Sequence, residues 1–235
     1  MRINAYLARQ LGISRRQADR IIQEGQVRRN GAVVTLGQQL DPERDRLEVA
    51  GKPVADQATA TVTVALYKPR AYLSTRSDPQ GRPTVMDLLP PDLRQLKPVG
   101  RLDYDSEGLL LLSNDGDFIF RATHPSHQTQ KEYRMCFRYP VEDSLLRDFR
   151  QGIELEEGIA RVDRLKRIAP DEIEIVLHQG WNRQLRRMAE SCGVRVARLI
   201  RVREGNIRLE HLQPGQWRRV RTKPEDGGSS PDRKD

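Results

Sequence analysis

The stretch from residue 51 to residue 60 limits what this chain can fold into, because it is too poor in large apolar side chains to belong to a core. It contains Pro53 and three alanines, a composition that is typical of a linker. A chain of 235 residues is long enough for one substantial core and a small accessory domain. The sequence therefore predicts a small domain over residues 1–50, a linker over residues 51–60, a larger domain over residues 61–220 and a disordered tail over residues 221–235.

The first fifty residues have the pattern of two short helices followed by a small sheet. Apolar residues recur at helical spacing near the start of the chain, at Ile3, Tyr6, Leu7 and Leu11. Ser14 with Gln17 three residues later is a capping-box pattern, which predicts the start of a second helix. Asn30 and Gly31 favour the positive φ angles of a tight turn, so residues 27–34 are expected to form a hairpin.

The predicted small domain is expected to present a basic face. Arginines remain on the outside of the second helix when its apolar residues point inward, and two more flank the hairpin turn, giving the set Arg15, Arg16, Arg20, Arg28 and Arg29. The whole chain has a formal net charge of +8, so a polyanion is the expected class of partner. RNA, DNA and acidic lipid all fit this charge, and so does a solvated helical hairpin without any ligand.

The order of these predicted elements, together with residues 14–19 and 27–31, resembles the S4 RNA-binding domain. The resemblance covers residues 2–49 and implies that the arginines of the basic face contact an RNA backbone. One departure is Ala5, where many S4 domains carry a lysine, so one contact is expected to be missing or moved.

The larger domain mixes strands and helices. Segments rich in β-branched and other apolar residues predict strands at residues 61–67, 109–112, 132–137, 160–165 and 172–177. Helical spacing predicts helices at residues 141–151 and 182–192. Because these elements do not alternate regularly, we expect an α+β domain with a largely antiparallel or mixed sheet.

An acidic loop precedes the most apolar run of the chain. Asp103 and Asp105 lie between two glycines, directly ahead of four leucines at residues 109–112. A polar loop that leads into a buried strand is a common place for a functional site. The residues alone leave three interpretations open, in which Asp103 pairs with Arg101, caps the following turn, or chelates Mg²⁺ together with Asp105.

The same loop resembles the signature of the pseudouridine synthases of the Rsu/Rlu type, which modify ribosomal RNA. The match runs through residues 100–103, 106–112 and 114–116, with further matching segments at residues 68–69, 74–85, 131–133 and 182–188. The resemblance extends from residue 2 to residue 220. It implies an enzyme that isomerises a specific uridine of ribosomal RNA to pseudouridine, and the segments at residues 78–84 and 131–133 favour the large-subunit RNA.

The resemblance also implies a reaction without a cofactor, in which the flipped uracil leaves C1′ of its ribose, rotates and rejoins through carbon. Asp103 is the implied catalytic carboxylate, which either attacks the sugar or base covalently or assists a glycal intermediate. Tyr133 is implied to stack on the base and is a candidate to remove the C2′ proton, and Arg186 is implied to pair with Asp103.

Helical spacing over residues 182–192 places Arg186 at the edge of an apolar stripe, with Arg183 and Arg187 facing solvent. In that position Arg183 and Arg187 would either solvate the helix or bind RNA phosphates, and Arg101 is expected either to bind phosphate or to support the acidic loop.

The cysteines, the histidines and the apolar runs exclude several classes of site. Cys136 and Cys192 lie far apart and outside any Cys-x-x-Cys pair, and the four histidines show no metal-ligand spacing, so neither a disulfide framework nor a metal site is expected. No apolar run approaches the roughly 20 residues of a bilayer span. We therefore expect a cytoplasmic monomer that binds ribosomal RNA and no membrane, metal or cofactor.

Two rival hypotheses belong to other functional classes. A ribosome-assembly factor that kept the fold without the chemistry would retain its function when Asp103 is replaced by alanine. An Mg²⁺-dependent RNA hydrolase that uses Asp103 and Asp105 would lose its activity in EDTA.

Overall fold

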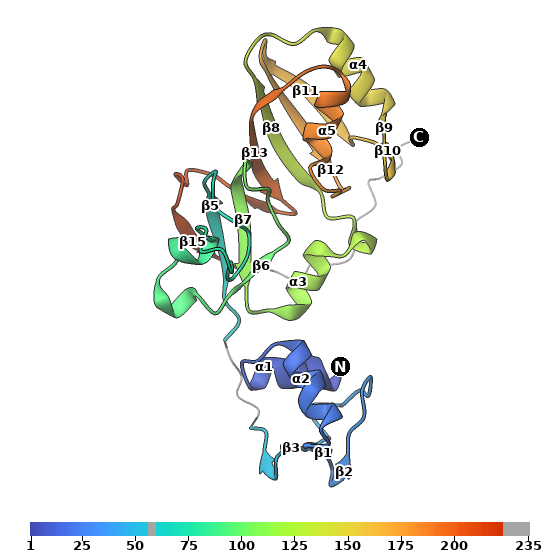
Figure 1. The fold of residues 1–235 in the computed structure, drawn as a ribbon, viewed down its shortest axis with the longest axis vertical. Helices are drawn as coiled ribbons and strands as arrows, with labels where there is room; N and C mark the ends of the chain where they lie inside the picture. The colour runs from blue at the N-terminus through green and yellow to red at the C-terminus, as the bar shows by residue number, and fades with distance from the viewer. Residues whose placement is uncertain (56–59, 223–235) are drawn as a thin grey trace, which may run out of the picture. The chain divides into compact units, whose positions relative to one another are not determined.

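The computed structural model describes residues 1–55 and 60–222 of the chain. The chain divides into two compact units, residues 1–61 and residues 62–235, whose elements are drawn in Figure 1. The predicted tail lies outside the described residues from residue 223 onward. Within the described ranges, no helix combines the length and the apolar character that a bilayer crossing requires.

The first unit combines two helices with a four-stranded antiparallel sheet in the order β2-β1-β3-β4. Its elements are α1 (Ile3–Gln10), α2 (Arg15–Gln23), β1 (Val27–Arg29), β2 (Ala32–Val33), β3 (Leu47–Val49) and β4 (Lys52–Pro53). The predicted capping box is confirmed, because Ser14 Oγ accepts from Gln17 N at 3.1 Å and Gln17 Oε1 accepts from Ser14 N at 2.8 Å. The predicted hairpin is also confirmed, with φ of 52° at Asn30 and 86° at Gly31.

The folded part of this unit extends beyond the predicted boundary at residue 50. Ala50 and Gly51 have φ of 50° and 76°, which makes a tight turn that returns the chain along β3 as β4. Val54 N then donates to Leu47 O at 2.8 Å, and Val54 packs against the core of the unit. The prediction of a linker from residue 51 missed this hairpin, because an Ala-Gly pair signals a tight turn less strongly than Asn-Gly does.

The second unit is built on one nine-stranded sheet in the order β11-β12-β8-β13-β7-β5-β15, with β14 paired to β13 and β6 paired to β7. The strands are β5 (Thr63–Lys68), β6 (Lys97–Val99), β7 (Glu107–Ser113), β8 (Lys131–Phe137), β11 (Arg164–Ala169), β12 (Glu172–Leu177), β13 (Val196–Glu204), β14 (Ile207–Arg208) and β15 (Trp217–Val220). Strands β9 (Ile153–Leu155) and β10 (Gly158–Ala160) form a separate hairpin.

The sheet is antiparallel except at one junction, where β7 and β13 pair in parallel. This junction joins the half that contains β5, β6 and β7 to the half that contains β8, β11 and β12. The predicted α+β class with a mainly antiparallel sheet is confirmed.

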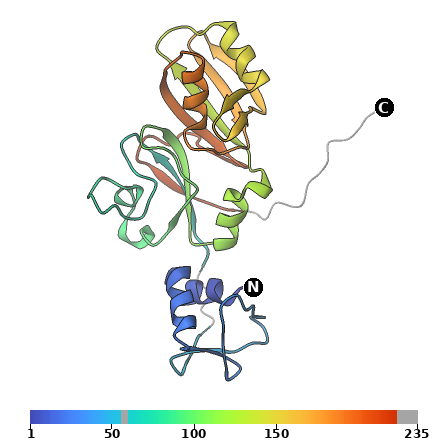
Figure 2. The same ribbon diagram turned by 45° about the vertical axis from the view of Figure 1, so that its right-hand side comes forward.

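Helices cover the sheet in three places. α4 (Asp143–Gln151) and α5 (Gln184–Ser191) contribute side chains to one core with β8, β12 and β13, and both lie against this half of the sheet in Figure 2. The short helices η1 (Val85–Leu88) and η2 (Pro91–Leu93) share a second core with β5 and β7. α3 (Gly116–Thr123), which precedes η3 (Pro125–His127), packs against alternate residues of the same two strands and so covers their other face.

Two sequence predictions for this unit need correction. Residues 160–165 do not form one strand, because β10 ends at Ala160 and β11 begins at Arg164 after a connection through Asp163. Strand β13 was not predicted, since arginines at positions 198, 201 and 203 break up its apolar pattern. Strand β13 supplies two charged side chains, Arg201 and Glu204, to the lining of a cavity in this unit.

Candidate active site

A cavity of about 310 Å³ opens in the second unit beside the loop that joins β6 to β7. This loop contributes Asp103, and neighbouring elements contribute further walls. The charged and aromatic side chains around the cavity are Arg101, Asp103, Lys131, Tyr133, Trp181, Arg183, Arg201 and Glu204. The cavity therefore brings carboxylates, cations and aromatic rings together on one partly apolar wall.

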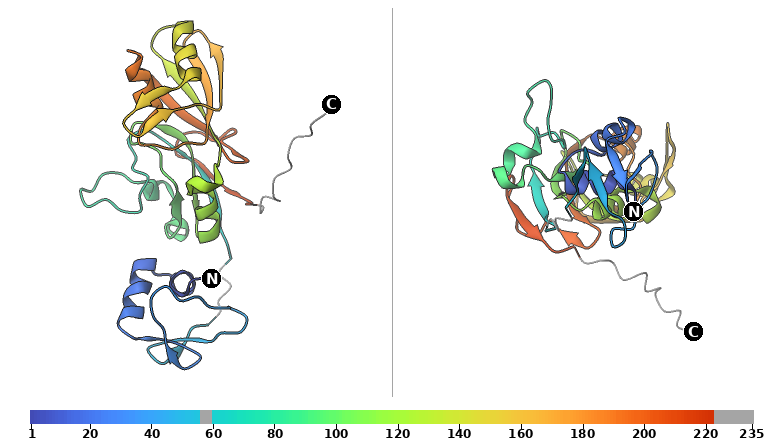
Figure 3. Two further views of the ribbon diagram at one scale, coloured as in Figure 1. Left: turned by 90° about the vertical axis from the view of Figure 1, so that its right-hand side faces the viewer. Right: turned by 90° about the horizontal axis from the view of Figure 1, so that it is seen from below.

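Asp103 is fixed in the cavity wall by backbone contacts on both of its sides. Ser74 Oγ donates to Leu102 O at 2.8 Å and accepts from Leu102 N at 3.1 Å. On the other side, Ala71 N donates to Tyr104 O at 2.8 Å. Ser74 belongs to the connection between β5 and η1, residues 69–84, part of which extends away from the sheet in Figure 3. Because these contacts come from the chain that follows β5, they hold the backbone on either side of Asp103 to the segment that leaves the central sheet.

The predicted ion pair between Asp103 and Arg186 is wrong. Arg186, which is buried in α5, places its Nε 3.3 Å from Asp105 Oδ2 and donates to Asp105 O at 2.9 Å. Arg183 Nη1 donates to Asp105 Oδ1 at 2.8 Å. Burial opposes ionisation of Asp105, but the Arg183 hydrogen bond and the Arg186 charge outweigh it and lower the pKa of this carboxyl. Among the residues that the structure describes, Asp103 forms no ion pair within 4.0 Å.

The side chains of Arg183 and Arg187 also lie elsewhere than the helical spacing predicted. Arg183 was predicted to face solvent, yet it lines the cavity and holds Asp105. The reason is that α5 begins only at Gln184 and Arg183 has a left-handed φ of 50°, so the helical projection does not apply to its side chain. Arg187 does not line the cavity, and its guanidinium donates to both oxygens of Glu157 at 2.9 and 2.7 Å.

Tyr133 faces the cavity from β8, beside Arg201 on the neighbouring strand β13. Burial raises the pKa of the Tyr133 phenol, while the positive charge of Arg201 opposes the rise. Arg201 is only 1% exposed and donates from Nε to Leu109 O at 2.7 Å. Its Nη2 lies 3.1 Å from Glu204 Oε2, so a fully buried ion pair forms part of the wall. The sequence reading missed Arg201 and Glu204 because it missed β13.

Lys68 lies behind the loop rather than in the cavity wall. Its ammonium is completely buried and donates to Ser106 O at 2.7 Å and to Pro69 O at 3.0 Å. Burial lowers the pKa of Lys68 to about 8, against the opposing influence of Asp103 and Asp105. The ammonium of Lys68 therefore ties the end of β5 to the acidic loop.

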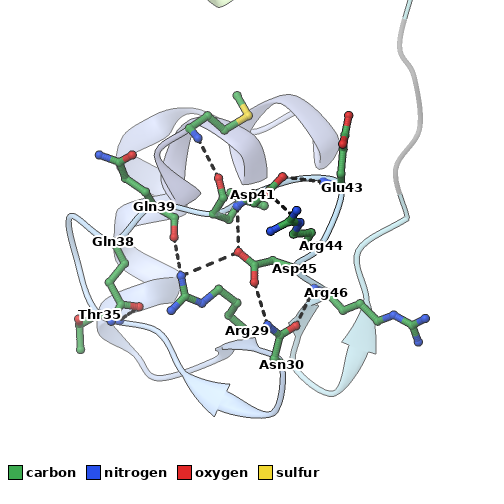
Figure 4. Close-up of polar contacts among 12 residues, drawn as sticks. Arg29, Asn30, Thr35, Gln38, Gln39, Asp41, Glu43, Arg44, Asp45 and Arg46 are labelled. Carbon is green, nitrogen blue, oxygen red and sulfur yellow. Dashed lines mark hydrogen bonds and ion pairs between the residues drawn. The ribbon is translucent and has the colours of Figure 1, made fainter.

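The arginines of the first unit fall into two groups. Those of α2, Arg15, Arg16 and Arg20, are exposed. The hairpin pair is engaged within the unit: Arg28 Nη1 donates to Gly31 O at 2.9 Å, and Arg29 Nη1 donates to Gln39 O at 2.6 Å while lying 3.9 Å from Asp45 Oδ2 (Figure 4). On α2, Arg15 Nη2 donates to Asn4 Oδ1 at 3.2 Å and Arg20 Nε donates to Glu24 Oε1 at 2.9 Å, so two of its three arginines also form contacts within the unit.

Two family models match the chain. The model described as RNA pseudouridylate synthase matches residues 62–191, and the S4 domain model matches residues 1–45. The first match contains Asp103, Tyr133 and Arg186, and the second contains the arginines of α2.

Known proteins resemble the chain over nearly its whole length. An uncharacterized RNA pseudouridine synthase of Aquifex aeolicus is 38% identical over 94% of this chain and 90% of its own length. A ribosomal large subunit pseudouridine synthase B of Bacillus subtilis is 38% identical over 88% of this chain and 86% of its own length. Among solved structures, a pseudouridylate synthase superposes with a TM-score of 0.68 at 27% identity, covering 94% of this chain and 96% of its own.

Proposed function

Since the chain belongs to the RNA pseudouridylate synthase family, we propose that it isomerises a uridine of large-subunit ribosomal RNA, with Asp103 as the catalytic carboxylate. The observation that carries this proposal is the position of Asp103 in the wall of a cavity of about 310 Å³ that Tyr133 and several cationic side chains also line. The choice of large-subunit RNA rests on the printed names of relatives such as the Bacillus subtilis protein.

The reaction needs little besides a well-placed carboxylate. The N1–C1′ bond breaks, a C5–C1′ bond forms, the proton on C5 leaves and N1 ends with a proton, so substrate and product are isomers. No oxidant or reductant enters this balance, and in this proposal the enzyme works as a monomer without a cofactor. Asp103 either attacks the sugar or base or assists loss of the base to a glycal, and both routes require it beside the ribose.

Cationic side chains surround the place where the negative charge of the detached uracil develops. Arg183 and Arg201 line the cavity and interact electrostatically with Asp103, and Lys68 and Arg186 do so from behind the loop. Cations fixed in a water-poor site stabilise a developing anion more than they would in water. Arg186 acts in this proposal by holding the loop through Asp105, in place of the direct pairing with Asp103 that the sequence suggested.

Tyr133 suits the flipped base. A uridine must leave its stack to reach the cavity, and an aromatic ring replaces part of the stacking that is lost. Arg101 and Arg183, at the cavity wall, are the proposed contacts to the phosphates of the flipped nucleotide. Arg187 is bound to Glu157 and is a weaker candidate for this task.

The test of the proposed function is a map of pseudouridine in ribosomal RNA from cells with and without this protein. We expect a specific uridine of the large-subunit RNA to remain unmodified in the cells that lack it. Loss of a pseudouridine from small-subunit or transfer RNA would correct the substrate and leave the activity in place. Identical maps of all these RNAs would overturn the proposal.

The α2 arginines are proposed to bind the RNA backbone, so the affinity for RNA should depend on the salt concentration through them. Replacing Arg15, Arg16 and Arg20 together by glutamine should weaken binding of ribosomal RNA. The slope of log affinity against log salt should fall by about one unit for each arginine that neutralises a phosphate. The measurement is a filter-binding titration at several salt concentrations.

A matched control removes three exposed arginines from the second unit instead, namely Arg138, Arg147 and Arg150, which lie in or near α4 and away from the cavity. This triple variant has the same net charge as the α2 variant. If both variants lower the slope equally, general charge and not the α2 surface governs RNA binding.

A further inference from the structure

Three aromatic rings meet on the surface of the second unit. They belong to Phe120 in α3, to His124, which is the N-cap of η3, and to His127, which is its last residue. The ring centroids of Phe120 and His124 lie 4.6 Å apart, those of Phe120 and His127 5.6 Å, and those of the two histidines 6.3 Å. Aromatic rings at such separations interact, so the three side chains form one ring cluster.

The ring cluster is exposed to solvent. All three residues are exposed, and the side chain of Phe120 is among the large apolar ones on the surface, at 53% exposure. The imidazole of His124 is held in place, because its Nδ1 lies 2.7 Å from Ser126 Oγ and accepts from Ser126 N at 3.3 Å. The cluster therefore offers aromatic surface whose arrangement is set before any ligand binds.

The ring cluster lies next to the cavity that holds Asp103. Thr123, the residue before His124, is part of the cavity lining. A Cβ added at Gly100 would lie 3.6 Å from Thr123 Cγ2, so the end of α3 packs against the start of the acidic loop. An RNA strand that delivers a uridine to this cavity therefore places the neighbouring nucleotides within reach of the ring cluster.

The charge around the ring cluster favours an anionic ligand. From residue 120 to residue 131 the chain contains Arg121 and Lys131 and no acidic residue, and the nearest acid before this segment is Asp117, in the first turn of α3. Arg121 and His127 line the same small pocket, and Lys131 lines the cavity. Unstacked RNA bases are commonly bound on the rings of phenylalanine and histidine. A base with its phosphate engages both the rings and the cations, whereas a purely apolar partner would leave the cations unused.

We propose that the ring cluster is a stacking surface for an unpaired base that neighbours the target uridine in the RNA substrate. This inference rests on the proposed function and adds a second point at which the catalytic unit holds its RNA. Flipping of the uridine breaks its stacking with the neighbouring bases, and a protein ring replaces part of what they lose. The ring cluster acts on binding and touches no reacting atom.

The experiment measures binding and conversion of an RNA fragment by the full-length protein. The fragment is centred on the uridine found by the mapping experiment. Phe120→Ala should weaken binding by about 5- to 150-fold, the range for loss of one stacked base. KM should rise while kcat stays unchanged, because the contact is the same in the ground state and the transition state. Unchanged affinity of a folded Phe120→Ala protein, or a fall in kcat without a change in KM, would overturn the proposal.

Two further substitutions separate stacking from apolar contact. Phe120→Tyr keeps an aromatic ring and should bind the fragment as the wild-type protein does. Phe120→Leu keeps a large apolar side chain without an aromatic face, and its affinity should be close to that of Phe120→Ala. Wild-type affinity in the leucine variant would mean that apolar area and not stacking is used at this position, which contradicts the proposal.

Tyr139→Ala is the matched control. Tyr139 is an aromatic residue of the same unit that is 68% exposed, it lies beside Arg138, with Cζ 5.6 Å from the ring centroid, and it does not line the cavity. Its removal should leave the affinity for the fragment unchanged. An equal loss of affinity in the Tyr139→Ala and Phe120→Ala variants would assign the effect to exposed aromatic surface in general and not to the ring cluster.

Fluorescence identifies the base that stacks. 2-Aminopurine, whose fluorescence falls when it stacks, replaces each unpaired base near the target uridine in turn. The wild-type protein should quench it at one position, and Phe120→Ala should not. If no position shows quenching that depends on Phe120, the ring cluster does not hold a base. Failure of the wild-type protein to convert a fragment that it binds would instead refute the proposed function, and the stacking surface would then be decided by the binding data alone.

Discussion

Replacement of Asp103 by asparagine is expected to abolish pseudouridine formation while RNA affinity stays unchanged. The amide has almost the same shape as the carboxylate, so the contacts of Ser74 with the adjacent Leu102 should persist. It has no negative charge with which to attack the sugar or to assist departure of the base. We expect kcat to fall by about 10⁴-fold or more, as when other enzymes lose an essential nucleophile. Single-turnover conversion of ribosomal RNA, with binding measured in parallel, checks this.

The neighbouring Asp105→Asn variant makes this test specific. Asp105 is held by Arg183 and Arg186, so its loss should loosen the loop and lower both activity and stability without removing the reacting group. Its pKa is lowered in the folded protein, so its contribution to stability is present above the unfolded pKa and is lost as the pH falls through the folded one. If Asp105→Asn abolished turnover while Asp103→Asn retained it, the catalytic carboxylate would have been assigned to the wrong residue.

Replacement of Gly108 by alanine is expected to have the largest effect on stability. Gly108 has φ of +103°, and an added Cβ would lie 2.4 Å from Arg201 O and 2.7 Å from Arg201 N. Both atoms belong to the backbone of β13 at its parallel junction with β7, so no side chain can move aside. Left-handed strain and this overlap together should lower the free energy of unfolding by about 3–5 kcal/mol. Urea denaturation followed by circular dichroism measures the change.

Gly116→Ala is the matched control for that experiment. Gly116 is the first residue of α3, its φ is not positive and an added Cβ would meet nothing within 4 Å. The substitution should leave the free energy of unfolding unchanged or raise it by up to about 1 kcal/mol, because alanine favours helix. If both substitutions lowered the free energy of unfolding equally, overlap of the added Cβ with β13 would not be the cause of the loss at Gly108.

Local sequence signals predicted those parts of the molecule that depend on neighbours along the chain. The Ser14 capping box and the Asn30-Gly31 turn formed as expected. The strand after the acidic loop also formed, as β7. Each of these features is decided within a few residues, by a cap, a turn or an apolar run.

Contacts between segments far apart in the chain could not be predicted from local sequence signals. Arg186 pairs with Asp105 and not with Asp103, because the turn after Asp103 directs the next acidic side chain toward α5. Arg183 reaches the cavity only because its backbone leaves the helical conformation just before α5. A helical projection, which assumes regular φ and ψ, gave the opposite result for this side chain.

The sequence by itself determined the family resemblance, the two-unit organisation and the identity of the acidic loop, since these follow from residue types and their spacing. Only the tertiary structure decided which charges meet. It placed Arg201 and Glu204 in the same cavity as Asp103 by pairing β13 with both β7 and β8. The physical reason is that an ion pair or a cavity wall depends on positions in space to within an ångström or so, and the packing of strands far apart in the chain sets those positions.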